Sequence, residues 1–251
     1  MWLSAAERHR FCEAKPPTIP KERKAFETKA MVIKMKILIT GTTQGIGKAI
    51  AERFLKERHT VIGIDRQEAS IADALYTHYI CDVRDFEKLP EVDNVDILIN
   101  NAGTQNENDI DTNLKALISV TEKYGVREGI RSVLNIGSAS GHTGAEFPEY
   151  AASKGGVLAY TKNVAMRIAP FGATCNSLDP GGVLTPLNEC VMNDPVLWEQ
   201  IMQETPLKKW ASAEEIAEWA YFLTVVNTFC TGQNLLVDGG ESINYRFIWK
   251  E

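Results

Sequence analysis

A tyrosine and a lysine one helical turn apart are the first residues whose types and spacing suggest chemistry. Tyr150 precedes Lys154 by four residues in the stretch PEYAASKGGVLAYTK, residues 148–162. In a helix this spacing places both side chains on one face. A phenol beside an ammonium can act as a general acid or base, because the positive charge favours the phenolate. The same pair could equally lie on a helix surface without any role, and the pair alone does not separate the two interpretations.

A glycine-bearing turn near residue 41 is the second candidate site. The stretch KILITGTTQGIGKAIAERF, residues 36–54, has the pattern of a strand, a turn and an amphipathic helix. Gly41, Gly45 and Gly47 fall where a chain must turn tightly, approach a pyrophosphate and pack a helix against a strand. The first N–H groups of the helix would then face the phosphates. The pattern predicts a dinucleotide site, although any tight strand-to-helix turn favours glycine.

An acidic residue after the next strand suggests which dinucleotide is bound. Asp65 ends the stretch VIGID, eighteen residues after Gly47. A carboxylate at this place accepts hydrogen bonds from the ribose hydroxyls and repels a 2′-phosphate. The alternative is a carboxylate that merely starts a turn, and Arg66 beside it could still tolerate a 2′-phosphate. The sequence therefore favours NAD as cofactor over NADP.

Short apolar runs rich in branched residues alternate with helical patterns from Lys36 onward. The candidate strands are 36–40, 60–65, 77–83, 95–100, 132–137, 173–178 and 234–238. The clearest helical patterns cover 47–58 and 152–168, and a short helix is expected over 67–75. Nearly unbroken apolar strands alternating with helices are typical of a parallel sheet covered on both faces. We expect a single α/β domain over residues 35–251, a doubly wound Rossmann-type fold with a central parallel sheet.

Two helix starts can be placed from their capping residues. Asp194 followed by Pro195 is typical of a helix N-cap and first turn. Ser212 with Glu215 three residues later has the pattern of a capping box.

Composition excludes several classes of protein. The net charge of −6 and the pI near 5.4 give no basic surface for nucleic acid. No apolar run approaches the ~20 residues needed to cross a bilayer, so no membrane partner is expected. Five scattered cysteines and four histidines without ligand spacing indicate reduced thiols, no metal site and a cytoplasmic location.

The first 34 residues differ from the rest of the chain. They hold eight Lys or Arg residues against four Asp or Glu residues, with three prolines between Pro16 and Pro20. They lack the apolar segment of a secretory signal. We expect a disordered extension, or a start assigned too early with Met31 or Met35 as the alternatives.

In their order and spacing these motifs resemble the classical short-chain dehydrogenase/reductase family, from Lys36 to about Glu241. The resemblance is carried by TGTTQGIG, CDVRD, NNAG, NIGSASG, YAASK, DPGGVLTP and GQNLLVDGG. By that resemblance, Asp82 and Val83 lie against the adenine, Asn101 lies nearest the ribose, and Val183 and Thr185 contact the nicotinamide carboxamide. The implied cofactor-binding set is Gly41, Thr43, Gln44, Gly45, Ile46, Gly47, Asp65, Asp82, Val83, Asn101, Ala102, Gly103, Tyr150, Lys154, Pro180, Gly181, Val183 and Thr185.

The resemblance also implies a mechanism in which Tyr150 takes the hydroxyl proton while hydride passes to the nicotinamide. Ser138 then hydrogen-bonds the reacting oxygen, Lys154 also holds the nicotinamide ribose, and Asn113 positions a water that connects Lys154 to solvent. Two alternatives stay open. Asn113 could be a plain helix-surface amide, and Ser140 could compete with Ser138.

Two departures from the family pattern affect the surroundings of the site. Only nine residues separate Gly103 from Asn113, where the family usually has a considerably longer segment. This shortening removes part of the wall beside the active site and part of a helix that commonly builds the dimer face. A homodimer or homotetramer is still expected. The helix over 67–75 must also be short.

These observations predict an NAD-dependent oxidoreductase that interconverts a small-molecule secondary alcohol and a ketone. The alternatives are an NADPH-dependent 3-oxoacyl-carrier-protein reductase and a non-catalytic NAD(H)-binding protein. Residues 187–210, which the resemblance places over the pocket as a mobile lid, carry Leu187, Met192, Trp198, Met202 and Trp210. The pattern of prolines and tryptophans in this segment resembles the corresponding segment of dehydrogenases that act on gluconate and deoxygluconate. A sugar acid, a polyol or a steroid is the expected substrate, although apolar residues at helical spacing can serve packing alone.

Overall fold

The computed structural model describes residues 34–105, 107–145 and 147–244. The expected extension, residues 1–34, falls outside the described residues except for Lys34. Everything below concerns the unit from Lys34 onward, in which the sheet, its helices and the candidate site all lie.

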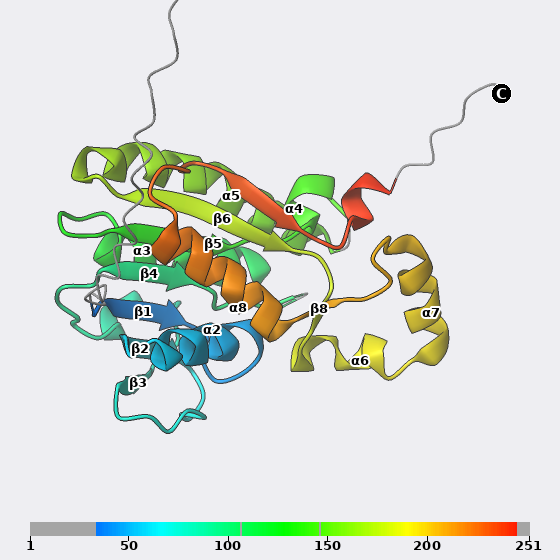
Figure 1. Ribbon diagram of the computed structural model, residues 1–251, viewed down its shortest axis with the longest axis horizontal. Coiled ribbons are helices and arrows are strands. Elements are labelled where there is room, and N and C mark those ends of the chain that lie inside the picture. Colours follow the sequence, from blue (N-terminus) through cyan, green and yellow to red (C-terminus); the bar gives the residue numbers. More distant parts are fainter. Residues whose placement is uncertain (1–33, 106, 146, 245–251) are drawn as a thin grey trace, which may run out of the picture. The chain divides into compact units, whose positions relative to one another are not determined.

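Seven parallel strands form the central sheet, in the order β3-β2-β1-β4-β5-β6-β9 (Figure 1). The strands are β1 (Lys36–Thr40), β2 (Thr60–Asp65), β3 (Tyr76–Ile80), β4 (Ile97–Asn100), β5 (Ser132–Ile136), β6 (Thr174–Pro180) and β9 (Asn234–Val237). The chain winds outward in one direction from β1 to β3 and in the other from β4 to β9, so the order reverses between β1 and β4. This is the doubly wound topology expected from the sequence. Ligands bind such sheets beyond the carboxyl ends of the strands at the reversal.

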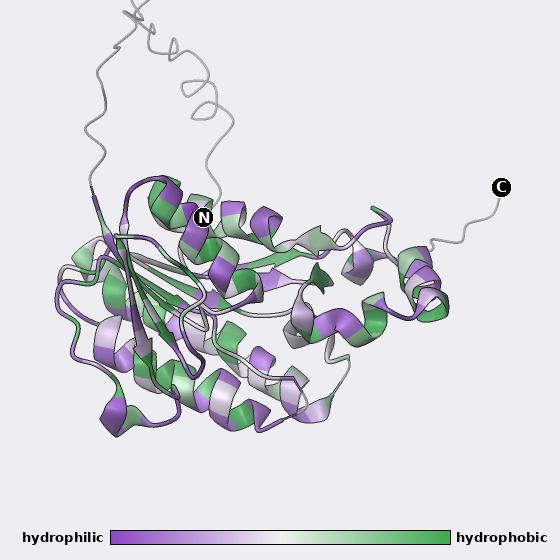
Figure 2. Cartoon of the chain, turned by 90° about the horizontal axis from the view of Figure 1, so that it is seen from below, coloured by the Kyte–Doolittle hydropathy of each residue, from purple (hydrophilic) through white to green (hydrophobic). Residues whose placement is uncertain are grey.

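Helices cover both faces of the sheet, and alternate residues of β1 show why. Ile37 and Ile39 pack in a buried cluster with residues of α2 (Gly45–Lys56) and α8 (Ala213–Tyr221). Leu38 points to the other face and packs with residues of α3 (Leu117–Tyr124) and α5 (Pro148–Ile168). The striping of hydrophobic and hydrophilic residues along the flanking helices is visible in Figure 2. A sheet buried on both faces explains the near-continuous apolar strands.

The remaining elements are short, and most of them lie near the carboxyl ends of the strands, although Ala169–Phe171 and Phe222–Val226 precede the amino ends of β6 and β9. They are α4 (Ser140–Thr143), α6 (Glu189–Met192), α7 (Pro195–Glu204), the parallel pair β7 (Val183–Leu184) and β8 (Ala211–Ser212), π-helices at Ile110–Ala116 and Phe222–Val226, and 3₁₀ turns at Phe86–Lys88, Ala169–Phe171, Pro186–Asn188 and Glu241–Ile243. Figure 1 shows α6 and α7 standing beyond the carboxyl edge of the sheet. Over the described part of the chain, no helix combines the length and apolar character needed to span a bilayer.

Both capping predictions are confirmed. Asp194 Oδ1 accepts hydrogen bonds from the N–H groups of Val196 and Leu197, each at 3.0 Å. Ser212 and Glu215 form a reciprocal capping box at the start of α8. These caps fix where α7 and α8 begin, and so where the segment between β7 and β8 turns.

The predicted helix over 67–75 is wrong, because this segment is an irregular loop between β2 and β3. Its polar side chains hydrogen-bond the backbone instead: the Ser70 hydroxyl donates to the Thr43 carbonyl at 2.7 Å, and Asp73 Oδ1 accepts from the Leu75 N–H at 2.8 Å. The bond within Asp73–Leu75 is a local alternative to helix formation, and the bond to Thr43 ties the loop to the turn after β1. The predicted strand over 77–83 also ends earlier, at Ile80.

Candidate active site

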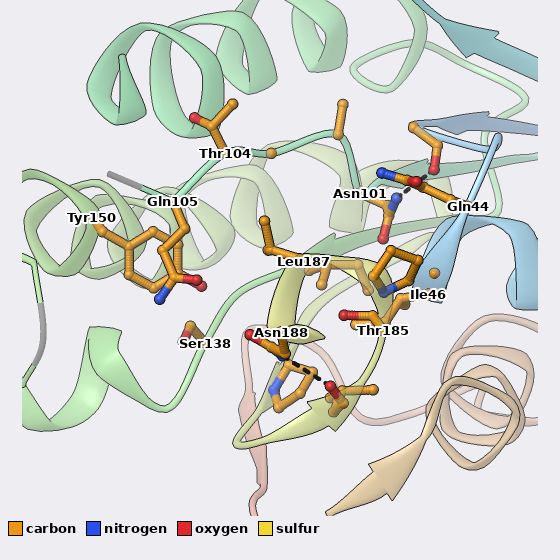
Figure 3. Close-up of a pocket in the computed structure, with 18 of the residues that line it drawn as sticks. Gln44, Ile46, Asn101, Thr104, Gln105, Ser138, Tyr150, Thr185, Leu187 and Asn188 are labelled. Atoms are coloured by element: carbon orange, nitrogen blue, oxygen red, sulfur yellow. Dashed lines mark hydrogen bonds between the residues drawn. The ribbon is translucent and has the colours of Figure 1, made fainter. Parts of the chain in front are cut away.

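A cavity of about 780 Å³ runs along the carboxyl ends of the strands and contains most of the residues singled out from the sequence. The predicted residues that line it are Gly41, Thr43, Gln44, Gly45, Ile46, Asp65, Asp82, Val83, Asn101, Ala102, Gly103, Ser138, Tyr150, Lys154, Pro180, Gly181, Val183 and Thr185. Gly47 and Asn113 lie behind this lining. In Figure 3, Tyr150, Gln105 and Ser138 gather at one end, and Gln44, Ile46 and Asn101 at the other.

The turn between β1 and α2 has the geometry that a pyrophosphate requires. Gly41 and Gly45 have φ angles of +74° and +55°, a region that side chains disfavour. Helix α2 begins at Gly45, and its N-cap residue Gln44 makes no side-chain cap, so the N-terminal N–H groups are left for another acceptor. An uncapped helix N-terminus opening into a cavity fits the phosphates of a dinucleotide.

Asp65 supports this turn as well as lining the cavity. Its Oδ2 accepts hydrogen bonds from the Thr43 N–H at 3.0 Å and the Thr43 hydroxyl at 2.9 Å, and its Oδ1 accepts from the Gln67 N–H at 3.1 Å. The carboxylate therefore joins the end of β2 to the phosphate turn. The alternative that Asp65 only starts a local turn does not account for its bonds to Thr43, which is twenty-two residues away in the sequence.

Asp82 is paired with an arginine at the same end of the cavity. Arg84 holds the Asp82 carboxylate through two nitrogens, with Arg84 Nη2 at 2.6 Å from Asp82 Oδ2. Hydrogen bonding from Arg84 lowers the pKa of Asp82, so the carboxylate is ionised at neutral pH. Arg66 and Arg84 both line the cavity here.

Asn101 ties β4 to the phosphate turn. Its side-chain nitrogen donates to the carbonyls of Thr40 at 3.0 Å and Gly41 at 2.8 Å. The Thr40 hydroxyl accepts in return from the N–H groups of Asn101 and Ala102, both at 3.0 Å. The two strands at the sheet's reversal point are thus locked together where the cofactor would lie.

Tyr150 and Lys154 lie one turn apart on α5, as their spacing predicts. Lys154 Nζ is 5.7 Å from the centre of the Tyr150 ring. Lys154 is 6% exposed, and its Nζ donates to the Ile136 carbonyl at the end of β5, at 2.9 Å. Burial lowers the pKa of Lys154 to about 8, against the opposing effect of the Asp179 and Asp109 carboxylates. A helix-surface pair without a role is excluded for this lysine, because it is buried.

Ser138 follows β5 and lines the cavity near Tyr150. Its side chain is buried, and its Oγ accepts from the Ser140 N–H at 3.2 Å. Ser140 also lines the cavity, so both hydroxyls named from the sequence are present at this end.

Asn113 is buried at 1% exposure in the π-helix Ile110–Ala116, so the alternative of a surface amide is wrong. Its side chain accepts from the Thr104 N–H at 2.8 Å and donates to the Thr104 carbonyl at 2.9 Å and to Ser153 Oγ at 3.1 Å. These bonds attach the short segment after Gly103 to α5. A role toward water near Lys154 stays a prediction.

The segment after Pro186 supplies one wall of the cavity. Leu187 and Trp210, two of the five apolar residues named from the sequence, line it, whereas Met192, Trp198 and Met202 are outside the lining. Trp198 instead packs edge-on against Trp210, with ring centres 5.1 Å apart. For Trp198 the packing interpretation is therefore the better one.

Sequence reasoning missed a buried pair near Lys154. Asp179, 0% exposed at the end of β6, accepts from His142 Nε2 at 2.7 Å and from the Ser177 hydroxyl at 3.1 Å. The one signal in the sequence was an aspartate near the end of an apolar strand, which could have indicated a buried carboxylate. Nothing in the sequence connects it to a histidine thirty-seven residues earlier.

Comparison with protein families and curated proteins gives consistent matches. The chain matches the family model described as enoyl-(acyl carrier protein) reductase over residues 41–242. It is 31% identical over 238 residues to a 3-oxoacyl-[acyl-carrier-protein] reductase of Thermotoga maritima, which covers 81% of this chain and 96% of that protein.

Two solved structures are similar over nearly their whole length. The ligand-free aldohexose dehydrogenase of Thermoplasma acidophilum has a TM-score of 0.75 and 28% identity, covering 88% of this chain and 98% of that one. A putative 2-deoxy-d-gluconate 3-dehydrogenase of Agrobacterium tumefaciens with bound NADP has a TM-score of 0.76 and 28% identity, covering 84% and 98%.

Proposed function

This chain belongs to the short-chain dehydrogenase/reductase family, and from that premise we propose that it is an NAD-preferring dehydrogenase of an uncharged polyhydroxy alcohol. The coarser statement follows from the family: the protein is an NAD(P)-dependent oxidoreductase of the alcohol and ketone type. The non-catalytic alternative is set aside on the same ground. The observation that carries the proposal is the buried Lys154 beside Tyr150 at the end of a cavity that also contains the phosphate turn.

The residues at this end have complementary chemical roles. A bound nicotinamide dinucleotide supplies the hydride acceptor or donor. The Tyr150 phenolate takes the proton of the substrate hydroxyl, and its formation is favoured by the ammonium of Lys154. The Ser138 hydroxyl donates to the reacting oxygen and so orients it. Asp65 and the N-terminus of α2 hold the adenosine ribose and the pyrophosphate at the other end.

The preference for NAD is supported by the position of Asp65 and opposed by the NADP in one similar structure. Asp65 lines the cavity while fixed by Thr43, so a ribose 2′-phosphate next to the turn would meet a negative charge that cannot easily move away. Arg66 and Arg84 could offset that repulsion, but Arg84 is held by Asp82. Arg66 is then the residue on which NADP binding would depend.

Exchanging Asp65 for asparagine is expected to shift the ratio of kcat/KM for NADPH over NADH at least about tenfold toward NADPH, which is about 1.4 kcal/mol. The amide keeps an acceptor for Thr43 and removes the charge. Adding Arg66→Gln to this variant should cancel the gain, because the partner of the 2′-phosphate is lost. Kinetics with both cofactors and one substrate measure the ratio, and a wild type that already prefers NADPH would contradict the assignment.

The charges around the cavity support an uncharged substrate rather than a sugar acid. Among the described residues that line it, the basic side chains are Arg66 and Arg84, next to the acidic residues of the adenosine end, and Lys154. The same lining also carries the carboxylates of Glu204 and Glu241. Away from the adenosine end, a substrate carboxylate would find no cation of the lining besides Lys154 and would be repelled by these two groups.

Polyols and aldoses are therefore expected to be oxidised with kcat/KM at least about tenfold higher than the matching sugar acids. A panel pairing each aldose or polyol with its acid, assayed with NAD at pH 8, measures this difference. Higher activity on the acids would contradict the charge argument.

A second candidate is an NADPH-dependent reductase of 3-oxoacyl thioesters, supported by the name of the relatives at about 30% identity. Reduction of an acetoacetyl thioester by NADPH faster than any polyol is oxidised would favour it.

We also propose a cytoplasmic location and a homo-oligomer for this protein. The exposed aromatic side chains of Trp219, Phe222 and Phe229 are consistent with contact between copies.

A further inference from the structure

Asp179 is a fully buried carboxylate with one oxygen in use and the other without a donor. Oδ2 accepts from His142 Nε2 at 2.7 Å and from the Ser177 hydroxyl at 3.1 Å. Oδ1 is buried and has no hydrogen-bond partner among the described residues. Buried polar groups are nearly always paired, so this oxygen calls for an explanation.

The orphaned oxygen lies on the side of the sheet that α5 covers, close to Lys154. A Cβ placed on Gly137 would lie 2.0 Å from Asp179 Oδ1 and 3.3 Å from Leu158 Cδ2. Leu158 is one turn after Lys154 on α5, and the Lys154 ammonium bonds the carbonyl of Ile136, the residue before Gly137. The carboxylate and the ammonium thus reach two adjacent residues at the end of β5, from β6 and α5 respectively. Only a glycine at position 137 leaves room for this approach.

We propose that Asp179 is a positioning residue whose buried carboxylate is the counter-ion that keeps Lys154 protonated in the active site, with His142 and Ser177 fixing that carboxylate. The inference rests on the proposed function of the same site. It explains the orphaned oxygen, because a carboxylate can be stabilised by a nearby ammonium without a direct hydrogen bond.

The electrostatics of the cluster point the same way. Burial lowers the pKa of Lys154 to about 8, and Asp179 is the first group opposing that loss. Burial raises the pKa of Asp179, while the bonds from His142 and Ser177 and the charge of Lys154 lower it. The other titratable groups facing Lys154 are Tyr150 on its own helix and Asp109 before the π-helix. If Asp179 were neutral, Asp109 would be the one remaining carboxylate of these groups to oppose the effect of burial on the pKa of Lys154.

The expected consequence concerns the pH at which Lys154 loses its proton. The folded-state pKa of this lysine is already below its ordinary value, and removing the Asp179 charge lowers it further. The ammonium would then be lost near neutral pH. The ribose contact and the support for the Tyr150 phenolate would be lost with it.

The test is a titration of Lys154 by NMR in full-length protein labelled with ¹³Cε-lysine, with its signal assigned by its absence in Lys154→Met. In Asp179→Asn the midpoint is expected to fall by about one pH unit or more. NADH affinity, measured by fluorescence from pH 6 to 9.5, should begin to decline at correspondingly lower pH. A purely structural role of Asp179 would weaken NADH binding equally at every pH.

Controls separate the charge from the packing. His142→Gln keeps the carboxylate and a donor to it, so its Lys154 midpoint should stay within about 0.3 units of the wild type. If Asp179→Asn does not fold, Asp179→Ser, which leaves a smaller polar group, takes its place in the same titration. An unchanged midpoint in the folded variant overturns the proposal. So does a wild-type midpoint below about 7, which needs no variant at all.

Failure of this inference and failure of the proposed function are distinguishable. The NMR midpoint reports the lysine whether or not the protein turns over any substrate. An unchanged midpoint with full dehydrogenase activity would remove only the role of Asp179. A shifted midpoint in a protein that oxidises no alcohol would remove only the proposed function.

Discussion

Tyr150→Phe is expected to lower turnover by about 10²–10⁴-fold, the scale for losing a positioned proton donor or acceptor. The substitution removes one hydroxyl and keeps the ring, so α5 should persist. NADH binding depends on the glycine turn, Asp65 and Lys154, and should change by less than about tenfold. Single-turnover rates measured beside NADH fluorescence titrations test both halves of this expectation. A variant that keeps more than half of the wild-type rate would refute the assigned role of Tyr150.

Tyr160→Phe is the matched control for this experiment. Tyr160 lies ten residues further along the same helix, and its hydroxyl donates to Glu122 Oε1 at 2.9 Å, outside the cavity lining. Removing that hydroxyl should leave turnover unchanged and cost at most about 1 kcal/mol of stability.

Lys154→Met should differ from both tyrosine variants. It removes the ammonium from the ribose and from the phenol, so NADH binding and turnover should both fall. Its removal also leaves the buried Asp179 carboxylate without the counter-ion proposed above, and the Ile136 carbonyl without its donor, so the melting temperature should fall. If Tyr150 and Lys154 were an incidental pair, both substitutions would have mild and similar effects near 1 kcal/mol.

Much of the fold could be predicted because its signals are local. A strand buried on both faces has to be a short apolar run, and the apolar runs at 36–40 and 60–65 coincide with β1 and β2. The glycine turn and the Tyr150–Lys154 spacing are local too. The edge strand β3 is the exception, since its burial is partial and its predicted end at 83 is three residues too late.

What could not be predicted depends on contacts between distant segments. Helical propensity over 67–75 gives way to the bond from Ser70 to Thr43, which no local pattern encodes. The burial of Asn113 depends on Thr104 and Ser153 coming together from two segments. Asp179 and His142 meet only once β6 and α4 are placed at one end of the sheet. The residues fixing the electrostatics of the site are therefore less visible in the sequence than the residues proposed to do the chemistry.

Gly47→Ala is expected to abolish measurable NADH binding, a loss of at least about 100-fold, and to lower the melting temperature. A Cβ at this position would lie 1.9 Å from the Gly41 carbonyl oxygen and 2.3 Å from Asn101 Nδ2. That nitrogen is itself held at 2.8 Å by the Gly41 carbonyl, so neither group can move without opening the turn. The methyl group must therefore push α2 away from β1 and misplace the N–H groups that face the phosphates.

The direction of the stability change makes this prediction sharp. Helix propensity alone favours alanine over glycine by about 1 kcal/mol, so a helical glycine without a packing role would be stabilised by the substitution. Gly155→Ala provides that comparison, because a Cβ on Gly155 in α5 would come no closer than 3.7 Å to its nearest neighbour, the Gly141 oxygen. In thermal melts, the melting temperature of Gly47→Ala should fall below that of the wild type and that of Gly155→Ala should rise above it. In NADH titrations, only Gly47→Ala should lose the cofactor. A stabilised Gly47→Ala protein that still binds NADH would show that the close packing of α2 on the turn is not what forms the phosphate site.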